Sequence, residues 1–295
     1  MELYKFCSLD SWSIKNIYNS HIYFSNIEDL NDSGECLFYI EDNVKDSRSD
    51  LNKFIEEASR IILHYRPCLS DKFYHHLKVL KRNGRGVEVI ATHIVAGMLK
   101  KYKTSSFTNV AGSSNPTMWG HYGNKSKGIC LQYELDCDQD GTINYINNDE
   151  IENIQIKDIS LSSIEDICKK ILFKKSKDWQ YEKEFRLLGM KNIVEVERSS
   201  LKCVYFGENV DIEDALFLKQ IIEDKYEGVR SAVVYHRRFS NMMVKNFVST
   251  KDQLRDVLIR KKEEDAYTDR YLSESAISEA LNGKGKGIKF STKKR

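Results

Sequence analysis

The stretch KCVYFGENVDIEDALFLKQIIEDKYEGVRSAVVYH, residues 202–236, carries the clearest pattern of secondary structure in the chain. β-Branched and aromatic residues at 202–207 and 230–236 predict two strands, and the segment 212–225 between them predicts a helix. A strand, a helix and a second strand in this order indicate a core that mixes helices with a sheet.

Similar patterns predict further elements on both sides of this stretch. We expect strands at 3–6, 21–25, 104–108, 128–135 and within 181–190. We expect helices after Asp10, at 45–65, 70–81 and 87–101, after Asn115, and at 161–175. The expected fold is therefore α+β, a mixed sheet with surrounding helices.

Composition limits the kind of protein this is. Hydrophobic residues make up 41% and charged residues 31% of the 295, a balance that supports a real core and a solvated surface. The formal charge of +2 does not single out nucleic acid as a partner. Seven scattered cysteines without a C-x-x-C pair argue against a disulfide framework and a zinc site. With no signal peptide or long apolar run, we expect a cytoplasmic protein with no membrane partner.

The character of the sequence changes near residue 248. Residues 1–248 are expected to form a single mixed α/β core domain, and 249–295 a charged C-terminal extension, partly disordered and dispensable for folding of the core. The last segment, GKGKGIKFSTKKR, carries six basic residues and no acidic residue. A solvated tail explains this composition, and a tail that contacts nucleic acid is the alternative.

Four short motifs concentrate polar and aromatic residues. They are YKF at 4–6, IYFS at 22–25 followed by DLNDSGE at 29–35, MWGHYG at 118–123 followed by KGICLQY at 127–133, and WQYEKEFR at 179–186. In this order and spacing they resemble the family known as domain of unknown function twenty-nine-seventy-one, over residues 3–240. Ser33 stands where that family usually has proline, and Gly123 where it usually has alanine. The resemblance implies a bacterial cytoplasmic protein.

The second motif supplies candidate polar groups. Asn31, Asp32 and Glu35 follow a strand, where loops commonly hold functional residues, although an Asx turn would use the same residue types. We predict that this loop, His121 and the segment 182–186 meet around one concave site.

The aromatic motifs offer a candidate proton carrier and several candidate contacts. His121 can exchange a proton near neutral pH, although a lone histidine is more often structural. Trp119 and Tyr122 lie three residues apart and share a helix face, which is more typical of a core than of a ligand platform. Trp179 opens the fourth motif and is a further candidate.

The fourth motif places two carboxylates two residues apart. If it is extended, Glu182, Glu184 and Arg186 point to one face, and the two carboxylates repel, which tends to raise one pKa. If it is helical, Glu182 and Arg186 form an ordinary i,i+4 ion pair. The strand interpretation is favoured by the residues that follow. Because Glu184 lies between the other two charges, we expect it to be the more important carboxylate for any activity.

The order of the motifs is also similar, by analogy, to that of ADP-ribosyltransferases. The analogy assigns NAD as cofactor and implies an enzyme of a defence or toxin system. It gives Glu184 the catalytic role, with Glu182 and His121 as the other catalytic candidates. The candidate cofactor-binding residues are Tyr4, Lys5, Tyr23, Ser25 and Arg186. A first-strand histidine or arginine is expected in such enzymes, and Lys5 stands in its place.

Two other classes of function remain open. Asp32, Glu35, Glu182 and Glu184 with Lys183 could assemble the Mg²⁺ site of a metal-dependent nuclease. A non-catalytic sensor or partner-binding protein would instead pair these groups internally. An NAD site requires Tyr23 and Glu184 to face one pocket, and a nuclease requires the carboxylates to gather within reach of one metal ion. No dedicated metal-binding motif is present.

Overall fold

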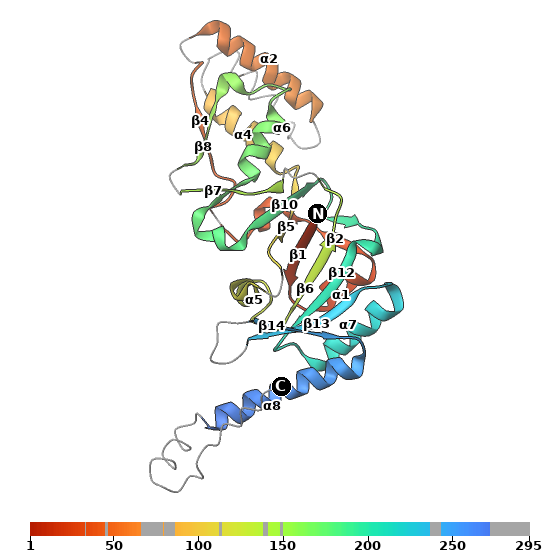
Figure 1. The fold of residues 1–295 in the computed structure, drawn as a ribbon. Helices are drawn as coiled ribbons and strands as arrows, with labels where there is room; N and C mark the ends of the chain where they lie inside the picture. The colour runs from red at the N-terminus through yellow and green to blue at the C-terminus, as the bar shows by residue number, and fades with distance from the viewer. Residues whose placement is uncertain are drawn as a thin grey trace, which may run out of the picture.

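The computed structural model has a mixed sheet at its centre with helices around it (Figure 1). It describes residues 1–32, 34–44, 47–65, 79, 86–111, 114–137, 141–147, 150–236 and 243–271. The strands are β1 Glu2–Cys7, β2 His21–Tyr23, β3 Ser25–Asn26, β4 Phe38–Glu41, β5 Lys103–Thr108, β6 Ile129–Glu134, β7 Asn144–Ile146, β8 Glu152–Gln155, β9 Lys174–Ser176, β10 Glu184–Gly189, β11 Ile193–Glu195, β12 Leu201–Gly207, β13 Arg230–His236 and β14 Met243–Val248. The helices are α1 Ser11–Tyr18, α2 Arg48–His64, α4 Val87–Leu99, α5 Pro116–His121, α6 Ile164–Leu172, α7 Ile212–Lys225 and α8 Lys251–Tyr271.

The main sheet has eight strands. Seven of them follow the order β10-β5-β1-β6-β12-β13-β14, and β3 pairs with β5 beside this path. Strands β12 and β13 are parallel and are joined through α7, and the other pairs of the sheet are antiparallel. The α+β class expected from the sequence is confirmed.

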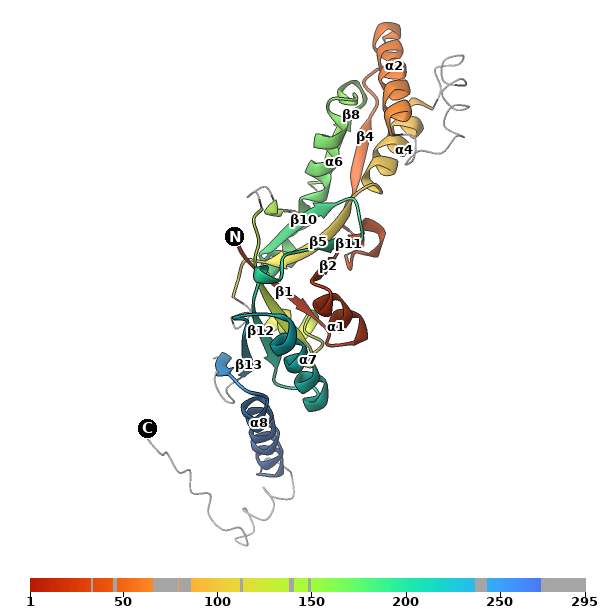
Figure 2. The ribbon, with the colours of Figure 1, turned by 90° about the vertical axis from the view of Figure 1, so that its right-hand side faces the viewer.

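The two faces of the main sheet are covered differently. Helices α1, α7 and α8 pack on one face, where Ile17, Leu218 and Leu258 join the apolar residues of β1, β6 and β12. The short helix α5 lies on the other face, where Trp119 packs edge-on against Phe6 with ring centroids 5.1 Å apart. Figure 1 shows α7 and α5 on opposite sides of the strands, and Figure 2 shows α1 and α7 together on one side. The residues of β1, β6, β12 and β13 that point to this second face form a third apolar cluster with α5 and are at most 8% exposed.

A second apolar cluster lies beyond the β10 edge of the sheet. Helices α2, α4 and α6 pack together there with the parallel pair β4 and β8, at the top of Figure 1. Residues such as Ile61, Ile94 and Ile171 are almost fully buried in this cluster. The segment that joins α6 to β10 passes between this helical part and the main sheet, so it lies where the two clusters meet.

Several local features follow from capping residues in the sequence. The Asp10 carboxylate accepts a hydrogen bond from the Ser13 amide, and the Asn115 side chain accepts one from the Met118 amide, so both predicted helix starts are confirmed. The strand expected at 21–25 is interrupted at Phe24, and the pieces on either side pair with different partners. The helix expected at 70–81 lies outside the described residues apart from Val79.

The region after Val248 is more closely attached to the core than its charge suggests. Helix α8 begins at Lys251, and its Leu254 and Leu258 are fully buried against the α7 side of the sheet. Both leucines lie within residues 249–295, which the sequence predicted to be a charged C-terminal extension. The basic end at 283–295 lies outside the described residues. No helix in the described part of the chain is both long and apolar enough to cross a membrane.

Candidate functional site

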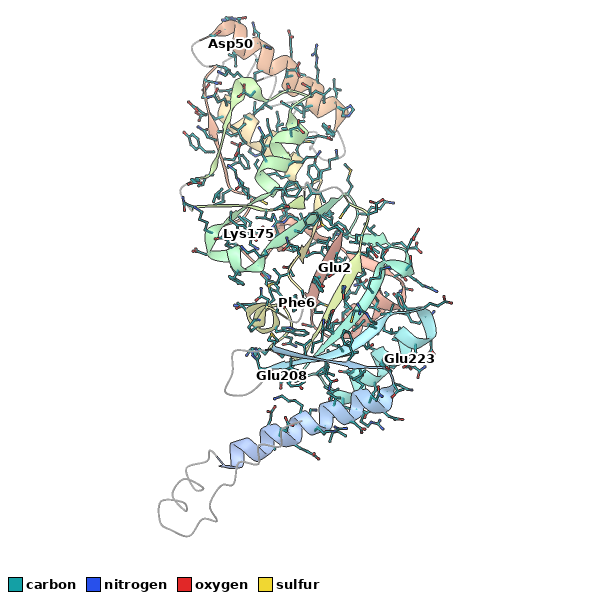
Figure 3. The ribbon with its side chains drawn as sticks, viewed as in Figure 1. Glu2, Phe6, Asp50, Lys175, Glu208 and Glu223 are labelled. Carbon is teal, nitrogen blue, oxygen red and sulfur yellow. The ribbon has the colours of Figure 1, made fainter. Side chains whose placement is uncertain are left out.

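A cluster of five buried charges lies at the junction of the helical part and the main sheet. Lys175 comes from β9, Glu184 and Arg186 from β10, and Glu182 from the last position of a 3₁₀ helix at Lys177–Glu182. Glu35 reaches the cluster from the loop before β4. Figure 3 marks Lys175 at this junction. All five side chains are at most 6% exposed, which is unusual for charged residues unless they are paired.

Lys175 is the centre of the cluster. Its ammonium nitrogen lies 2.7 Å from a carboxylate oxygen of Glu182, 3.0 Å from one of Glu184 and 3.2 Å from one of Glu35. The three hydrogens of an ammonium group can each meet one of these oxygens. The ammonium therefore holds three carboxylates from three different segments in one place.

Arg186 closes the other side of the cluster. Its guanidinium donates to Glu35 at 2.6 Å, to Glu184 at 2.8 Å, and to the main-chain carbonyl of Leu172 at 2.6 Å. Ser106 on the neighbouring strand β5 donates a further hydrogen bond to Glu184 at 2.6 Å. The Glu184 carboxylate consequently accepts hydrogen bonds from Lys175, Arg186 and Ser106, so it has little capacity left for a ligand.

The backbone at Lys183 explains how two nearby glutamates reach the same lysine. The 3₁₀ helix ends at Glu182, Lys183 adopts a left-handed conformation with φ of 46°, and the strand begins only at Glu184. The strand interpretation of the fourth motif is thus correct for Glu184 and Arg186 and wrong for Glu182, because alternation does not extend across the turn. Both carboxylates nevertheless converge on Lys175.

Glu184 is held in its ionised form. Burial opposes its charge, but Arg186 and Lys175 outweigh burial and lower the pKa of Glu184 to about 2. The same pairing raises the pKa of Lys175 and of Arg186 above their ordinary values, although burial alone would lower both. These three groups form a fixed set of charges at neutral pH.

Glu182 behaves in the opposite way. Burial raises the pKa of Glu182 above its ordinary value, and the hydrogen bonds from Lys175 and Tyr122 offset only part of that effect. The Tyr122 hydroxyl donates to Glu182 at 2.5 Å, and burial together with Glu182 raises the pKa of this tyrosine. Glu182 is thus the carboxylate of this pair that takes up a proton more readily.

Two cavities reach the cluster. The smaller, of about 80 Å³, is lined by Tyr4, Asn31, Tyr122, Glu182 and Glu184 among others. It can hold a few waters or one small polar group, because the share of one water in the liquid is about 30 Å³.

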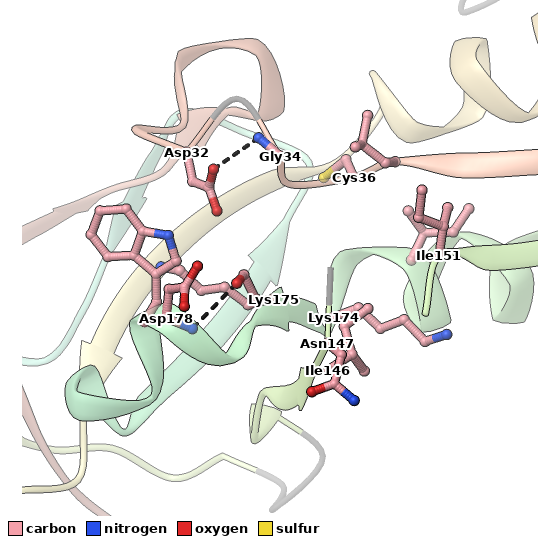
Figure 4. Close-up of a pocket in the computed structure, with 13 residues that line it drawn as sticks. Asp32, Gly34, Cys36, Ile146, Asn147, Ile151, Lys174, Lys175 and Asp178 are labelled. Carbon is pink, nitrogen blue, oxygen red and sulfur yellow. Dashed lines mark hydrogen bonds between the residues drawn. The ribbon is translucent and has the colours of Figure 1, made fainter. Parts of the chain in front are cut away.

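The larger cavity, of about 310 Å³, is lined by Asp32, Cys36, Asp178 and Trp179 among others (Figure 4). Its size is at the lower end of the range for small-molecule sites, roughly 300–1,000 Å³. Lys175 lines both cavities, so this residue separates them.

The structure brings together several of the residues singled out in the sequence. Tyr4, Asn31, Glu35, Tyr122, Glu182 and Glu184 line the smaller cavity, with Arg186 directly behind it. Asp32 and Trp179 line the larger one. The loop at 31–35 and the segment 182–186 therefore meet, as predicted.

Other candidates lie elsewhere. His121 is exposed and lines neither cavity, although its ring lies 6.0 Å from that of Tyr181 in the fourth motif; its neighbour Tyr122 lines the smaller cavity. Tyr23 packs edge-on against Trp12, and Ser25 pairs with β5 away from the cavity lining. The structure does not bring Tyr23 and Glu184 to one pocket.

Two further candidates, Lys5 and Trp119, make contacts within the sheet and its apolar core. Lys5 lies on the helix-covered face of the sheet, where its ammonium donates to the Ser105 hydroxyl at 2.9 Å, and burial lowers its pKa. Trp119 is 1% exposed and belongs to the core beside Phe6, as its helical spacing with Tyr122 indicated.

The sequence reasoning missed Lys175, Ser106 and Tyr145. Lys175 fell at the end of a predicted helix, but that helix ends at Leu172 and Lys175 belongs to a short strand. Tyr145 accepts a hydrogen bond from the main-chain amide of Glu184 at 2.7 Å. The only available signal was charge balance, since three acidic candidates and one arginine require another cation if they are buried together.

Within the described residues, no group of three or more His, Cys, Asp or Glu side chains is arranged to hold a metal ion. The carboxylates of Glu35, Glu182 and Glu184 do gather, but the ammonium of Lys175 occupies the point where they converge. The geometry is that of an ion cluster centred on a lysine.

Comparison with known families identifies one segment of the chain. Residues 118–187 match the family described as protein of unknown function (DUF2971). The match covers 70 of the 295 residues. The matched segment contains the third and fourth motifs up to Leu187 and, with them, Tyr122, Lys175, Glu182, Glu184 and Arg186. No curated protein and no solved structure gave a significant match. Tyr4 and Glu35, which complete the site, lie before the matched segment.

Proposed function

We propose that this protein is an enzyme in which Glu182 transfers a proton to or from a small polar group of the substrate. The observation that carries the proposal is that Glu182 and Glu184 share Lys175 while their pKa values are moved in opposite directions. Two carboxylates with separated pKa values at one cavity are the arrangement that acid–base enzymes use to divide the roles of proton carrier and fixed charge.

Glu182 is the better proton carrier of the two. A carboxyl with a pKa of about 2, as Glu184 has, cannot take up a proton near neutral pH. Glu182 has a raised pKa, lines the cavity and has Tyr122 at hydrogen-bond distance. We therefore assign proton transfer to Glu182 and not to Glu184, the reverse of the priority expected from the sequence.

The fixed charges position the proton carrier. Lys175 orients the Glu182 carboxylate from one side, while Glu184 and Arg186 hold Lys175 in place. Positioning by groups that are already paired needs no rearrangement during the reaction. The smaller cavity admits only a small group of the substrate, such as a carbonyl or hydroxyl, and the rest of the substrate must lie outside it.

NAD-dependent ADP-ribosyl transfer in a bacterial defence or toxin system is the more specific form of this proposal. It is supported by the place of Glu184 and Tyr4 at one cavity, and the position of Tyr23 away from that cavity weighs against it. A non-catalytic binding protein is the second candidate, favoured by the internal pairing of the five charges. A metal-dependent nuclease would require displacement of the Lys175 ammonium.

The test is consumption of substrate by wild type and by Glu182→Gln. Each protein is incubated with NAD⁺ and, separately, with a cellular extract of small molecules, and depletion is followed by mass spectrometry. Glu134→Gln, which alters an exposed ion pair with Lys202 that lines neither cavity, is the matched control. We expect depletion by wild type and the control and a loss of at least 100-fold in Glu182→Gln, in line with roughly 10²–10⁴-fold for acid–base catalysis. Depletion at the wild-type rate by Glu182→Gln would contradict the assignment, and depletion of no compound by the wild type would favour the binding protein.

A further inference from the structure

The α5 face of the main sheet carries a row of residues from the charged cluster to β13, buried along most of its length and exposed at Arg230. Glu184, Thr108, Tyr4, Gln132, Cys203 and Arg230 are successive cross-strand partners on β10, β5, β1, β6, β12 and β13. Cross-strand partners point to the same face of a sheet. With neighbouring strands about 4.8 Å apart, the row is about 24 Å long.

Cations and aromatic rings alternate at the far end of this face. The Arg230 guanidinium lies 5.3 Å from the centre of the Phe247 ring, and the Lys245 ammonium lies 5.0 Å from the same ring. That ammonium is also 5.5 Å from the ring of Tyr205, which in turn lies 6.3 Å from the ring of Tyr4. The strand register places these side chains on the α5 face, opposite α1, α7 and α8.

Three residues at this end of the face, Arg230, Lys245 and Phe247, are exposed to solvent. Phe247 is 47% exposed, and both Arg230 and Lys245 are exposed. Neither cation is in an ion pair with a carboxylate of the described residues. An exposed phenylalanine with two cations beside it suits a ligand that offers flat rings and negative charges at short spacing.

We propose that the patch formed by Arg230, Phe247 and Lys245 binds single-stranded nucleic acid, with one base stacked on Phe247 and adjacent phosphates on the two cations. Base stacking on an aromatic residue together with a positively charged track is the usual recognition mode for single strands on open sheet faces. In a duplex the flat faces of the bases stack on one another, so they are not available to stack on Phe247. A free nucleotide normally requires a pocket that encloses it, and an acidic peptide gains nothing from Phe247.

The experiment measures fluorescence anisotropy of a labelled oligothymidylate of about 12 nucleotides, a length within the roughly 4–16 nucleotides that single-strand-binding folds cover. The full chain is titrated at several salt concentrations between about 50 and 200 mM. The variants are Phe247→Ala and Lys245→Gln, and the control is Phe217→Ala, an exposed phenylalanine of α7 on the opposite face. Thermal unfolding of each variant checks that the fold is intact.

Each variant has its own expected signature. Loss of one stacked base should weaken binding by Phe247→Ala about 5- to 150-fold. Loss of one phosphate contact in Lys245→Gln should reduce the slope of log K against log salt by about 1, and Phe217→Ala should bind as wild type does. A duplex of the same length should bind less tightly than the single strand.

Three results would overturn the proposal. The first is no binding at the lowest salt. The second is binding that Phe247→Ala and Lys245→Gln leave unchanged, which would move the contact to another part of the chain such as the basic end. The third is equally tight competition by thymidine monophosphate or polyglutamate, which would reassign the patch to free nucleotides or acidic proteins.

Discussion

Glutamine in place of Glu184 should lower the stability of the protein, whereas glutamine in place of Glu182 should not. Glu184→Gln removes a charge that compensates Lys175 and Arg186, both of which remain buried. Glu182→Gln removes a group whose ionisation burial already disfavours. The two substitutions are identical in chemistry and lie two residues apart, so each is a control for the other.

The expected loss in Glu184→Gln follows from its pKa. The ordinary value of 4.5 is lowered to about 2, and at about 1.36 kcal/mol for each pKa unit this is about 3 kcal/mol of stability at neutral pH. The carboxylate is 2% exposed, so solvent screening takes little from this figure. Breaking a buried ion pair by removing one partner costs a similar amount, about 3–5 kcal/mol. At about 2–4 °C per kcal/mol, Tm should fall by roughly 6–12 °C.

The contributions of Glu184 and Glu182 to stability depend on pH in opposite directions. A lowered folded-state pKa means that Glu184 stabilises the protein above about pH 4.5 and loses this contribution as the pH falls toward about 2. The difference between wild type and Glu184→Gln should therefore shrink across that acidic window. A raised folded-state pKa means that ionised Glu182 costs stability once the pH rises above its unfolded-state pKa. Glu182→Gln should have an unchanged or slightly higher Tm at neutral pH.

Thermal unfolding of the three proteins by circular dichroism, at neutral pH and at a series of acidic values, measures both effects. The partly exposed pair of Glu152 with Lys174 supplies a reference, because Glu152→Gln should change stability by no more than about 1 kcal/mol. A Tm of Glu184→Gln within about 2 °C of wild type, less than 1 kcal/mol, would refute the account of the buried cluster. So would a loss in Glu182→Gln as large as that in Glu184→Gln.

Three other substitutions test separate parts of the structure. Leu258→Ala should cost about 2–5 kcal/mol because this α8 side chain is fully buried, whereas Ile259→Ala, at 39% exposed, should change stability by less than about 1 kcal/mol in denaturant unfolding. Gly123→Ala should lower Tm, because a Cβ there would lie 2.8 Å from the indole of α5 and 2.9 Å from a main-chain oxygen; an unchanged Tm would show that the turn can move. Tyr122→Phe should raise the pKa of Glu182 further, because it removes a hydrogen bond to the carboxylate, and a lower pKa in a carbon-13 titration by nuclear magnetic resonance would contradict this.

Much of the fold could be predicted because local patterns and capping residues agree with the tertiary structure. The helix at 212–225 and the strand at 230–236 have the predicted bounds, and Asp10 and Asn115 cap the helices expected of them. Helix α8 was missed because its charge is high and only two of its leucines reach the core. In that helix tertiary packing, and not composition, decides the structure.

The site could be predicted only in part. The loop at 31–35 and the segment 182–186 were expected to meet, because polar and aromatic residues are concentrated in only a few short motifs of this sequence. Lys175 could not be found, because its role depends on contacts with residues up to 140 positions away that no local pattern encodes. The turn at Lys183 has a positive φ, which the sequence does not indicate because no glycine stands there. The start of the strand at Glu184 could therefore not be predicted.

The position of β1 in the middle of the sheet has a consequence for folding kinetics. Strand β1, Glu2–Cys7, pairs on one side with β6, Ile129–Glu134, and on the other side with β5. The ion pair between Glu35 and Arg186 joins residues 151 positions apart. Contacts this distant in sequence close large loops, so topology places the protein among slow folders. Until those loops close, Glu35 remains hydrated and apart from Lys175 and Arg186, and the cluster is incomplete. We therefore expect the cluster to be completed after the rate-limiting step, so that Glu184→Gln accelerates unfolding and leaves the refolding rate almost unchanged.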